Sequence, residues 1–223
     1  IAQWYVEAGK YNVLPVDSRG TLRFADERPQ ITADRKTFTY YPGTQVVPSN
    51  AAVNVMNRSF SITADADIPK DGAEGVVYSM GGNDGGLTFY MMDKKLKYAY
   101  NYATAEYFYV ESKDAVPEGR HKLRFEFEVT GKPDVAKGKG ASGKAQLYID
   151  DKLVGQSEIP YTLPLMMGLG AGASVGCDPG SPAIPDYKPP FEFTGKIYSV
   201  IVDVSGELIK DDEASMKAIM ARQ

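Results

Sequence analysis

Residues 75–110, GVVYSMGGNDGGLTFYMMDKKLKYAYNYATAEYFYV, decide the fold. This stretch holds four short apolar or aromatic segments, and a glycine-rich cluster from Gly81 to Gly86 separates the first two. Short segments rich in Val, Tyr and Phe, bounded by Gly, Asn and Asp, are typical of antiparallel strands joined by tight turns. We therefore expect strands at 75–80, 87–92, 95–102 and 106–110.

The same pattern continues on both sides of this stretch. Upstream, Phe60, Ile62 and Ala64 alternate with polar residues, the period of two that places one face of a strand against a core. Downstream, Asp150-Asp151-Lys152 is a hairpin signal. Further strands are expected at 120–129, 145–149, 153–159, 173–177 and 195–204. About ten short strands without long helices between them predict an all-β sandwich or barrel rather than a parallel sheet.

The expected organisation is one domain with two flanking segments. The sandwich covers 58–205, and residues 1–57 are polar and rich in turn formers, so we expect them to wrap the sandwich or to join it to a preceding region. A helix end is expected within residues 1–13, stopping near Gly9. The tail, 206–223, is expected to carry a short C-terminal helix over 211–222. Residues 130–143, with three lysines and four glycines, suggest a mobile surface loop.

Composition excludes several classes of protein. The 223 residues are 43% apolar and 24% charged, which is ordinary for a globular chain and excludes a disordered one or a coiled coil. The net charge of −4 gives no basic field for nucleic acid or anionic lipid. One cysteine excludes an internal disulfide framework, and one histidine excludes a His-cluster metal centre. No run of 18 apolar residues predicts a membrane span. We expect neither nucleic acid nor a membrane as partner.

Tyrosines suggest a binding surface. Tyr98, Tyr100 and Tyr102 share one side of an expected strand, and Tyr107 and Tyr109 follow on the next. Aromatic rings with a polar tip suit contact with carbohydrate, so Tyr98, Tyr100 and Tyr102 are candidate ligand-binding residues. Cross-strand tyrosine pairs also stabilise a sheet without binding anything, and this alternative stays open.

Metal and catalytic candidates are fewer. Asp178 and Asp186, with loop carbonyls, offer hard oxygens that would suit a structural Ca²⁺, although two carboxylates eight residues apart are not an ion motif. Glu126 and Glu128 lie two apart on one expected strand, as an acid/base pair of a glycosidase would, but a solvent-facing strand gives the same pattern. His121 has no Ser or Cys partner in a recognisable motif. No catalytic residue is therefore assigned.

A set of short motifs resembles a known family. They are AGKYNVLP at 8–15, TYYPG at 39–43, NRSFSI at 57–62, IPKDGAEG at 68–75 and GSPAIPDYKPPFEFT at 180–194. Together they resemble the C-terminal region of bacterial arylsulfatases, over nearly the whole chain. The resemblance implies a concanavalin A-like or laminin-G-like jelly roll attached to an upstream sulfatase catalytic domain, in a periplasmic or extracellular protein.

The resemblance also implies that the catalytic apparatus of the parent, a formylglycine and a divalent metal, lies outside this chain, which does not begin with Met and which we interpret as a fragment. Cys177-Asp178-Pro179 imitates the start of the C-x-P-x-R sulfatase motif, but Ser181 stands where Arg is needed. The chain itself is thus expected to be a cofactor-free, non-catalytic accessory domain that packs on or stabilises the catalytic domain. The alternatives are a carbohydrate-binding module that recruits sulfated glycans, and a free-standing glycosidase on Glu126 and Glu128.

Overall fold

The computed structural model describes residues 1–14, 35–48, 51–168 and 172–210. The chain divides into two units, one of residues Ile1–Pro29 with Asp211–Gln223 and one of Gln30–Lys210. In the first unit the described element is a helix, α1 (Ala2–Lys10), which ends near the expected Gly9. The expected helix at 211–222 lies outside the described residues. No helix in the described ranges is long and apolar enough to cross a membrane.

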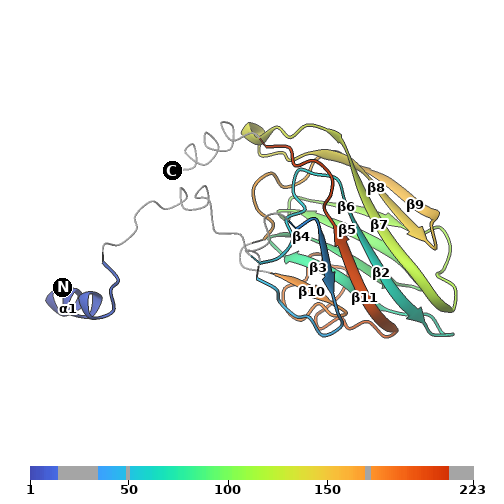
Figure 1. Ribbon diagram of the computed structural model, residues 1–223, viewed down its shortest axis with the longest axis horizontal. Helices are drawn as coiled ribbons and strands as arrows, with labels where there is room; N and C mark the ends of the chain where they lie inside the picture. The colour runs from blue at the N-terminus through green and yellow to red at the C-terminus, as the bar shows by residue number, and fades with distance from the viewer. Residues whose placement is uncertain (15–34, 49–50, 169–171, 211–223) are drawn as a thin grey trace. The chain divides into compact units, whose positions relative to one another are not determined.

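The second unit is a sandwich of two antiparallel sheets, so the expected all-β jelly-roll fold is confirmed (Figure 1). The six-stranded sheet has the order β1-β11-β2-β7-β8-β9, and the five-stranded sheet has the order β10-β3-β4-β5-β6. Their bounds are β1 (Thr37–Tyr40), β2 (Phe60–Ile68), β3 (Gly75–Gly82), β4 (Gly85–Met92), β5 (Lys95–Tyr102), β6 (Glu106–Glu111), β7 (Gly119–Gly131), β8 (Ser142–Ile149), β9 (Lys152–Ile159), β10 (Ala173–Val175) and β11 (Lys196–Asp203).

Two segments are more ordered than the sequence suggested. Part of the segment 1–57 belongs to the sandwich, because β1 pairs with β11 and Val53 and Val55 are buried in the core. The lysine-rich segment 130–143 is shortened by the ends of β7 and β8 and contains a 3-10 turn, Val135–Lys137. The Tyr102 hydroxyl donates a 2.6 Å hydrogen bond to the Gly138 carbonyl, which ties this turn to the end of β5.

The core lies between the two sheets. Along β2 buried and half-buried residues alternate, so one face of the strand packs inward as its sequence period requires. At the centre, the rings of Tyr98 and Phe125 stack with centroids 3.6 Å apart and an interplanar angle of 8°. Both side chains are essentially inaccessible to solvent, so this contact joins the sheets through β5 and β7.

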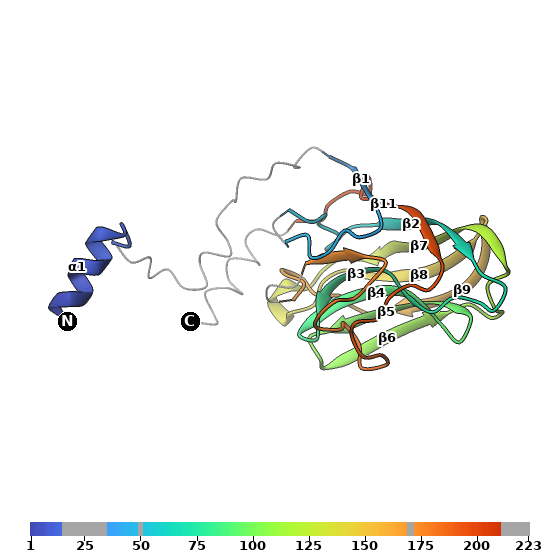
Figure 2. The same ribbon diagram turned by 90° about the horizontal axis from the view of Figure 1, so that it is seen from below.

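The five-stranded sheet differs from the six-stranded one because its middle strands are buried on both faces. The outer face is covered by residues 177–194, which we call the strap. Figure 2 shows the orange-brown trace of this segment running along the five-stranded sheet on the side away from the six-stranded sheet. A second, smaller hydrophobic cluster forms beneath it, made of Val76, Tyr90, Ala99, Ile184 and Tyr187, with Met92, Tyr107 and Phe191 packed against it.

Candidate functional site

The strap is fastened to the sheet by its backbone. The Val76 amide donates to the Phe191 carbonyl at 3.2 Å, and the Thr194 amide donates to the Glu74 carbonyl at 2.8 Å. Gly75, at the start of β3, has a φ of 112°, and a Cβ there would collide with the backbone of Glu192. A glycine is needed at this position on both counts, since the backbone conformation and the close approach of the strap each exclude a side chain.

A buried polar cluster holds the middle of the strap. The Tyr187 hydroxyl donates a 2.7 Å hydrogen bond to Oδ2 of Asp178 and lies 3.2 Å from Oγ1 of Thr88 on β4. Burial raises the pKa of the Asp178 carboxyl, although hydrogen bonds from Tyr187 and from the backbone of Gly180 and Ala183 oppose the shift. Burial likewise raises the pKa of Tyr187. A neutral hydroxyl that meets a buried carboxyl is what fixes the strap at this point.

Two tyrosines of β6 emerge at the edge of this covered face. Tyr107 and Tyr109 are two residues apart and so point to the same side of the sheet, with ring centroids 6.5 Å apart. Tyr109 is 43% exposed. Its hydroxyl donates a 3.1 Å hydrogen bond to Oδ1 of Asp186, an exposed residue of the strap. We call Tyr107, Tyr109 and Asp186 the β6 tyrosine site.

The Tyr109 hydroxyl stays protonated at physiological pH. Burial, followed by the charge of Asp186, raises the pKa of Tyr109 to about 12. The same causes, burial first and then Asp186, raise the pKa of the neighbouring Tyr90. Asp186 thus carries its negative charge beside two tyrosine hydroxyls, while the ring of Tyr109 remains accessible to a ligand.

Charged side chains around the site are arranged in pairs. Nζ of Lys95 lies 3.0 Å from Oε1 of Glu111, and Nζ of Lys97 lies 3.2 Å from Oδ2 of Asp93 and 3.6 Å from Oε2 of Glu111. The hydrogen bond from Lys95 is the main reason why the pKa of Glu111 is lowered. Both lysines are therefore already engaged by carboxylates of this surface.

The expected tyrosine surface is placed differently by the structure. Tyr98 and Tyr100 are 1% and 3% exposed, and their side chains point into the core rather than toward solvent. The Tyr100 hydroxyl accepts a 2.8 Å hydrogen bond from the Leu163 amide. Tyr102 is half-buried and meets the ring of Tyr161 edge to face at 4.9 Å. Tyr98 and Tyr100 therefore follow the alternative interpretation, in which the tyrosines stabilise the sheet by packing, because a glycan cannot reach rings buried between the sheets.

The two acidic residues considered for calcium have separate hydrogen-bond partners. Asp178 is 5% exposed and bonded to Tyr187, whereas Asp186 is exposed and bonded to Tyr109. Among the described residues, no group of three or more His, Cys, Asp and Glu side chains is placed to hold a metal ion. The structure does not bring the two carboxylates together on one ligand position, and a Ca²⁺ held by them stays a prediction.

The remaining chemical candidates lie on β7 of the six-stranded sheet or at the start of the strap. Glu126 and Glu128 are on the outer face of β7, where Glu126 pairs with Arg124. Nδ1 of His121 lies 2.6 Å from Oδ2 of Asp150 in the β8–β9 turn. Cys177 is buried at the root of the strap, and burial raises the pKa of its thiol, which opposes nucleophilic use. This pattern favours structural roles for all of them.

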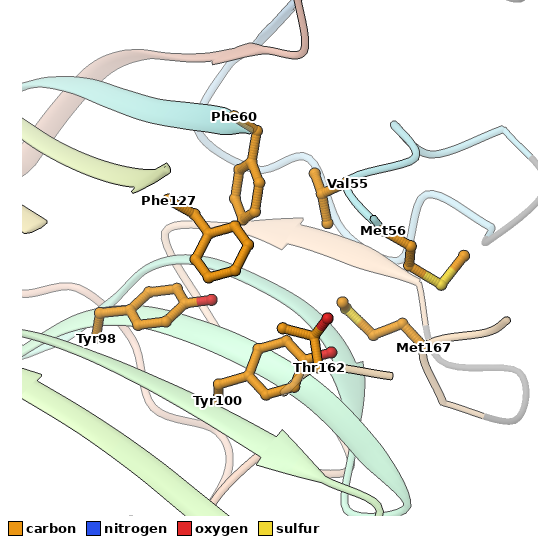
Figure 3. A pocket seen from close by; sticks show the side chains of 8 residues that line it. All are labelled: Val55, Met56, Phe60, Tyr98, Tyr100, Phe127, Thr162 and Met167. Atoms are coloured by element: carbon orange, nitrogen blue, oxygen red, sulfur yellow. The ribbon is translucent and has the colours of Figure 1, made fainter. Parts of the chain in front are cut away.

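Two hollows of the described part of the sandwich bear on ligand binding. One is a space of about 10 Å³ between the sheets, lined by eight side chains that include Tyr98, Tyr100 and Phe127, which is room for about one water molecule (Figure 3). The other is an open groove of about 220 Å³ at the β10 edge, where Cys177, Glu192 and Phe193 contribute to the lining. Small-molecule pockets are usually about 300–1,000 Å³, so neither hollow is large enough to enclose a typical ligand.

The comparisons with known proteins support the fold. No model of a protein family matches the sequence, and no curated protein matches it. Among solved structures, the sandwich is similar to the CBM40 of an IT-sialidase from Ruminococcus gnavus bound to α2,3-sialyllactose, with 11% identity, 82% of this chain and 97% of that chain covered, and a TM-score of 0.50. It is also similar to NanB in complex with Optactamide, with 12% identity, 80% and 27% covered, and a TM-score of 0.52. Laminin α1 domains LG4-5 of mouse have 13% identity, 78% and 42% covered, and a TM-score of 0.47.

Identities this low establish a shared jelly-roll architecture and leave the ligand to be argued from the residues of this chain. The sequence analysis noticed Tyr107 and Tyr109 only as part of a tyrosine run. Their period of two marked a shared face, but the contribution of Asp186, 77 residues later, had no signal in the sequence.

Proposed function

We propose that the sandwich is a non-catalytic carbohydrate-binding domain that holds a glycan at the β6 tyrosine site. The observation that carries this proposal is the exposed Tyr109 ring, with Tyr107 beside it at 6.5 Å and Asp186 hydrogen-bonded at its tip. The C–H face of a pyranose packs on an aromatic ring, while its hydroxyls need acceptors at the ring edge. The Asp186 carboxylate supplies such acceptors.

Rigidity also supports binding at this site. Tyr107 and Tyr109 lie on a strand, and Asp186 is held by a strap whose backbone and Tyr187 are bonded to the sheet. A site formed by ordered elements loses little conformational entropy when it captures a ligand. The R. gnavus CBM40, which shares the fold, was solved with sialyllactose bound, so the architecture is compatible with glycan binding. A domain with this role is expected where polysaccharides are met, in the periplasm or outside the cell.

The test compares two tyrosine variants on a glycan array. Tyr109→Ala is expected to abolish the signals that the unaltered protein gives, because it removes the stacking ring. Tyr41→Ala is the matched control, since Tyr41 is 62% exposed on a different part of the sandwich. Signals that survive Tyr109→Ala, or an array without signals for the unaltered protein, would contradict the proposal.

A second candidate is an accessory domain of an arylsulfatase that packs on the catalytic domain. The motif resemblance suggests it, and one feature of α1 favours a protein partner. Within the nine residues of this helix only Ala8 is buried, while Trp4, Tyr5 and Val6 are 51–67% exposed. Exposed aromatic and aliphatic side chains that gather on one short helix are typical of a contact surface.

The coding sequence that precedes Ile1 in the same reading frame tests this candidate. A C-x-P-S-R motif there is expected if the parent is a sulfatase with a formylglycine and a divalent metal in its catalytic domain. A frame that lacks the motif would leave the glycan-binding role as the function of this chain. The two candidates are compatible, because a glycan-binding domain can also pack on the enzyme that it serves.

A further inference from the structure

We propose that the β6 tyrosine site selects neutral glycans and disfavours sulfated or sialylated ones. This inference rests on the proposed function and specifies its ligand class. It follows from the charges that surround Tyr109, which differ from those that an anionic sugar would require.

The charged group that contacts the hydroxyl of the exposed Tyr109 ring is a carboxylate. Asp186 accepts the hydrogen bond of the Tyr109 hydroxyl at 3.1 Å, Glu111 ends β6, the strand that carries the tyrosine pair, and Asp93 lies in the turn between β4 and β5. Asp186 and Glu111 both raise the pKa of Tyr90, after burial as the main cause, so both carboxylates act on the same patch of the outer face. An incoming sulfate or carboxylate would meet these groups at the rim of the ring.

The cations of this surface are already paired. Lys97 is bonded to Asp93 and Glu111, its side chain is only 17% exposed, and Lys95 is bonded to Glu111. To bind an anionic ligand, either ammonium group would have to leave a carboxylate that it already contacts at 3.0–3.2 Å. The exchange would replace one ion pair by another and would leave a carboxylate uncompensated.

Lys188 is the cation that could reverse this preference. It is the only basic residue in the strap sequence, two positions after Asp186, and it is exposed. The strap also carries Asp178, Asp186 and Glu192, so its formal charge is negative even when Lys188 is counted. A Lys188→Gln variant separates the contribution of this cation from that of the tyrosine site.

The experiment uses the glycan array with matched pairs that differ in one anionic group: lactose, 3′-sulfolactose and 3′-sialyllactose, with other neutral oligosaccharides and their monosulfated forms. Two unit charges about 4 Å apart in water interact by about 1 kcal/mol, which corresponds to about a fivefold weaker binding of the anionic member of each pair. Asp186→Asn keeps an acceptor for Tyr109 and removes the charge, so it should narrow the gap in affinity between the neutral and the anionic member of each pair. High salt should narrow it too.

Glu128→Gln serves as the matched control, because it removes one negative charge from the outer face of β7 in the other sheet and should leave the gap unchanged. Tighter binding of the sulfated member that is lost in Tyr109→Ala would overturn the inference and leave glycan binding intact. A preference for the sulfated member that is lost in Lys188→Gln would overturn it in the same way. Absence of all glycan signals would overturn the proposed function, and the inference with it.

Discussion

The hydroxyl of Tyr187 donates a 2.7 Å hydrogen bond to the carboxyl of Asp178, and both groups are buried between the strap and the five-stranded sheet. This contact lies beneath the segment that carries Asp186 to the edge of β6. The stability of the strap and the geometry of the candidate glycan site are therefore linked through one hydrogen bond.

Removing the donor of this bond is expected to destabilise the fold. Tyr187→Phe keeps the ring that packs on Tyr90 and on Phe191 but leaves the buried Asp178 with fewer partners. Loss of a hydrogen bond to a buried acceptor costs about 1–3 kcal/mol. Urea unfolding followed by circular dichroism measures this loss, and Tyr41→Phe on the exposed turn should change the free energy of unfolding by less than about 0.5 kcal/mol. Equal stability of both variants would contradict the structural role of the bond.

Asp178 also predicts a pH dependence. Its pKa is raised above the ordinary value of 3.8 in the folded state, so the folded protein binds the proton more tightly than the unfolded chain does. The contribution of this group to stability is thus fully present below about pH 4 and is lost as pH rises through the folded pKa. Relative to the unaltered protein, Asp178→Asn should gain stability as pH rises from about 4 to 7 in unfolding experiments. A difference that does not vary with pH would show that burial does not shift this carboxyl.

Asp150 predicts the opposite slope and serves as the comparison. The hydrogen bond from His121 is the main cause of its lowered pKa, so its contribution to stability is present above the ordinary value of 3.8 and is lost as pH falls through the folded pKa. Relative to the unaltered protein, Asp150→Asn should therefore lose stability as pH rises toward 4. The same unfolding series, extended to acid pH, measures both variants. If the stability of both variants, relative to the unaltered protein, changed with pH in the same direction, the direction of the pKa shift assigned to Asp178 or to Asp150 would be wrong.

The close approach of the strap to β3 predicts a strong effect of a single methyl group. Gly75→Ala places a Cβ against the backbone of Glu192 at a φ of 112°, and strained backbone of this kind costs about 1–3 kcal/mol. Gly180→Ala is the matched control within the strap, because nothing lies within 4 Å of the added atom. Urea unfolding of the two variants is the measurement. A Gly75→Ala protein as stable as Gly180→Ala would mean that the strap is not held against β3.

Buried aromatic residues should behave differently from those at the glycan site. Phe125→Ala removes the ring that stacks on Tyr98 between the sheets, and a change of this kind costs about 3–5 kcal/mol. Tyr109→Ala removes a ring that is 43% exposed and should cost far less stability while abolishing glycan binding. Thermal unfolding and the glycan array, applied to both variants, separate the two roles. A large loss of stability in Tyr109→Ala would show that this ring belongs to the core.

The sequence predicted the strands better than the faces that they present. The alternation at Phe60, Ile62 and Ala64 identified β2, because that strand has one buried and one solvent-facing side. On β5 the same logic fails, since both sides of the strand are buried and a shift of one residue exchanges them. Tyrosine fits a core or a surface equally well, so Tyr98 and Tyr100 could be placed on the wrong side.

The strap could not be predicted for a related reason. Residues 177–194 contain five prolines and have no period of two or of 3.6, so the sequence gives no indication that they cover a sheet. Their position depends on contacts between segments far apart in the chain, such as that of Tyr187 with Thr88. The candidate site could not be predicted from the sequence for the same reason, because Tyr109 and Asp186 are brought into contact by the position of the strap.

Because Cys177 is buried, the rate at which its thiol is chemically labelled can report movement of the strap. The chain has a single thiol, which lies at the root of the strap. Cys177 is 7% exposed and lines the groove at the β10 edge, so a bulky thiol-specific fluorophore should react with it faster when the segment lifts from the sheet, and the labelling rate under native conditions reports that opening. A bound glycan that bridges Tyr109 and Asp186 would slow the labelling. The kinetics of one chemical modification would then record ligand occupancy without any engineered tag.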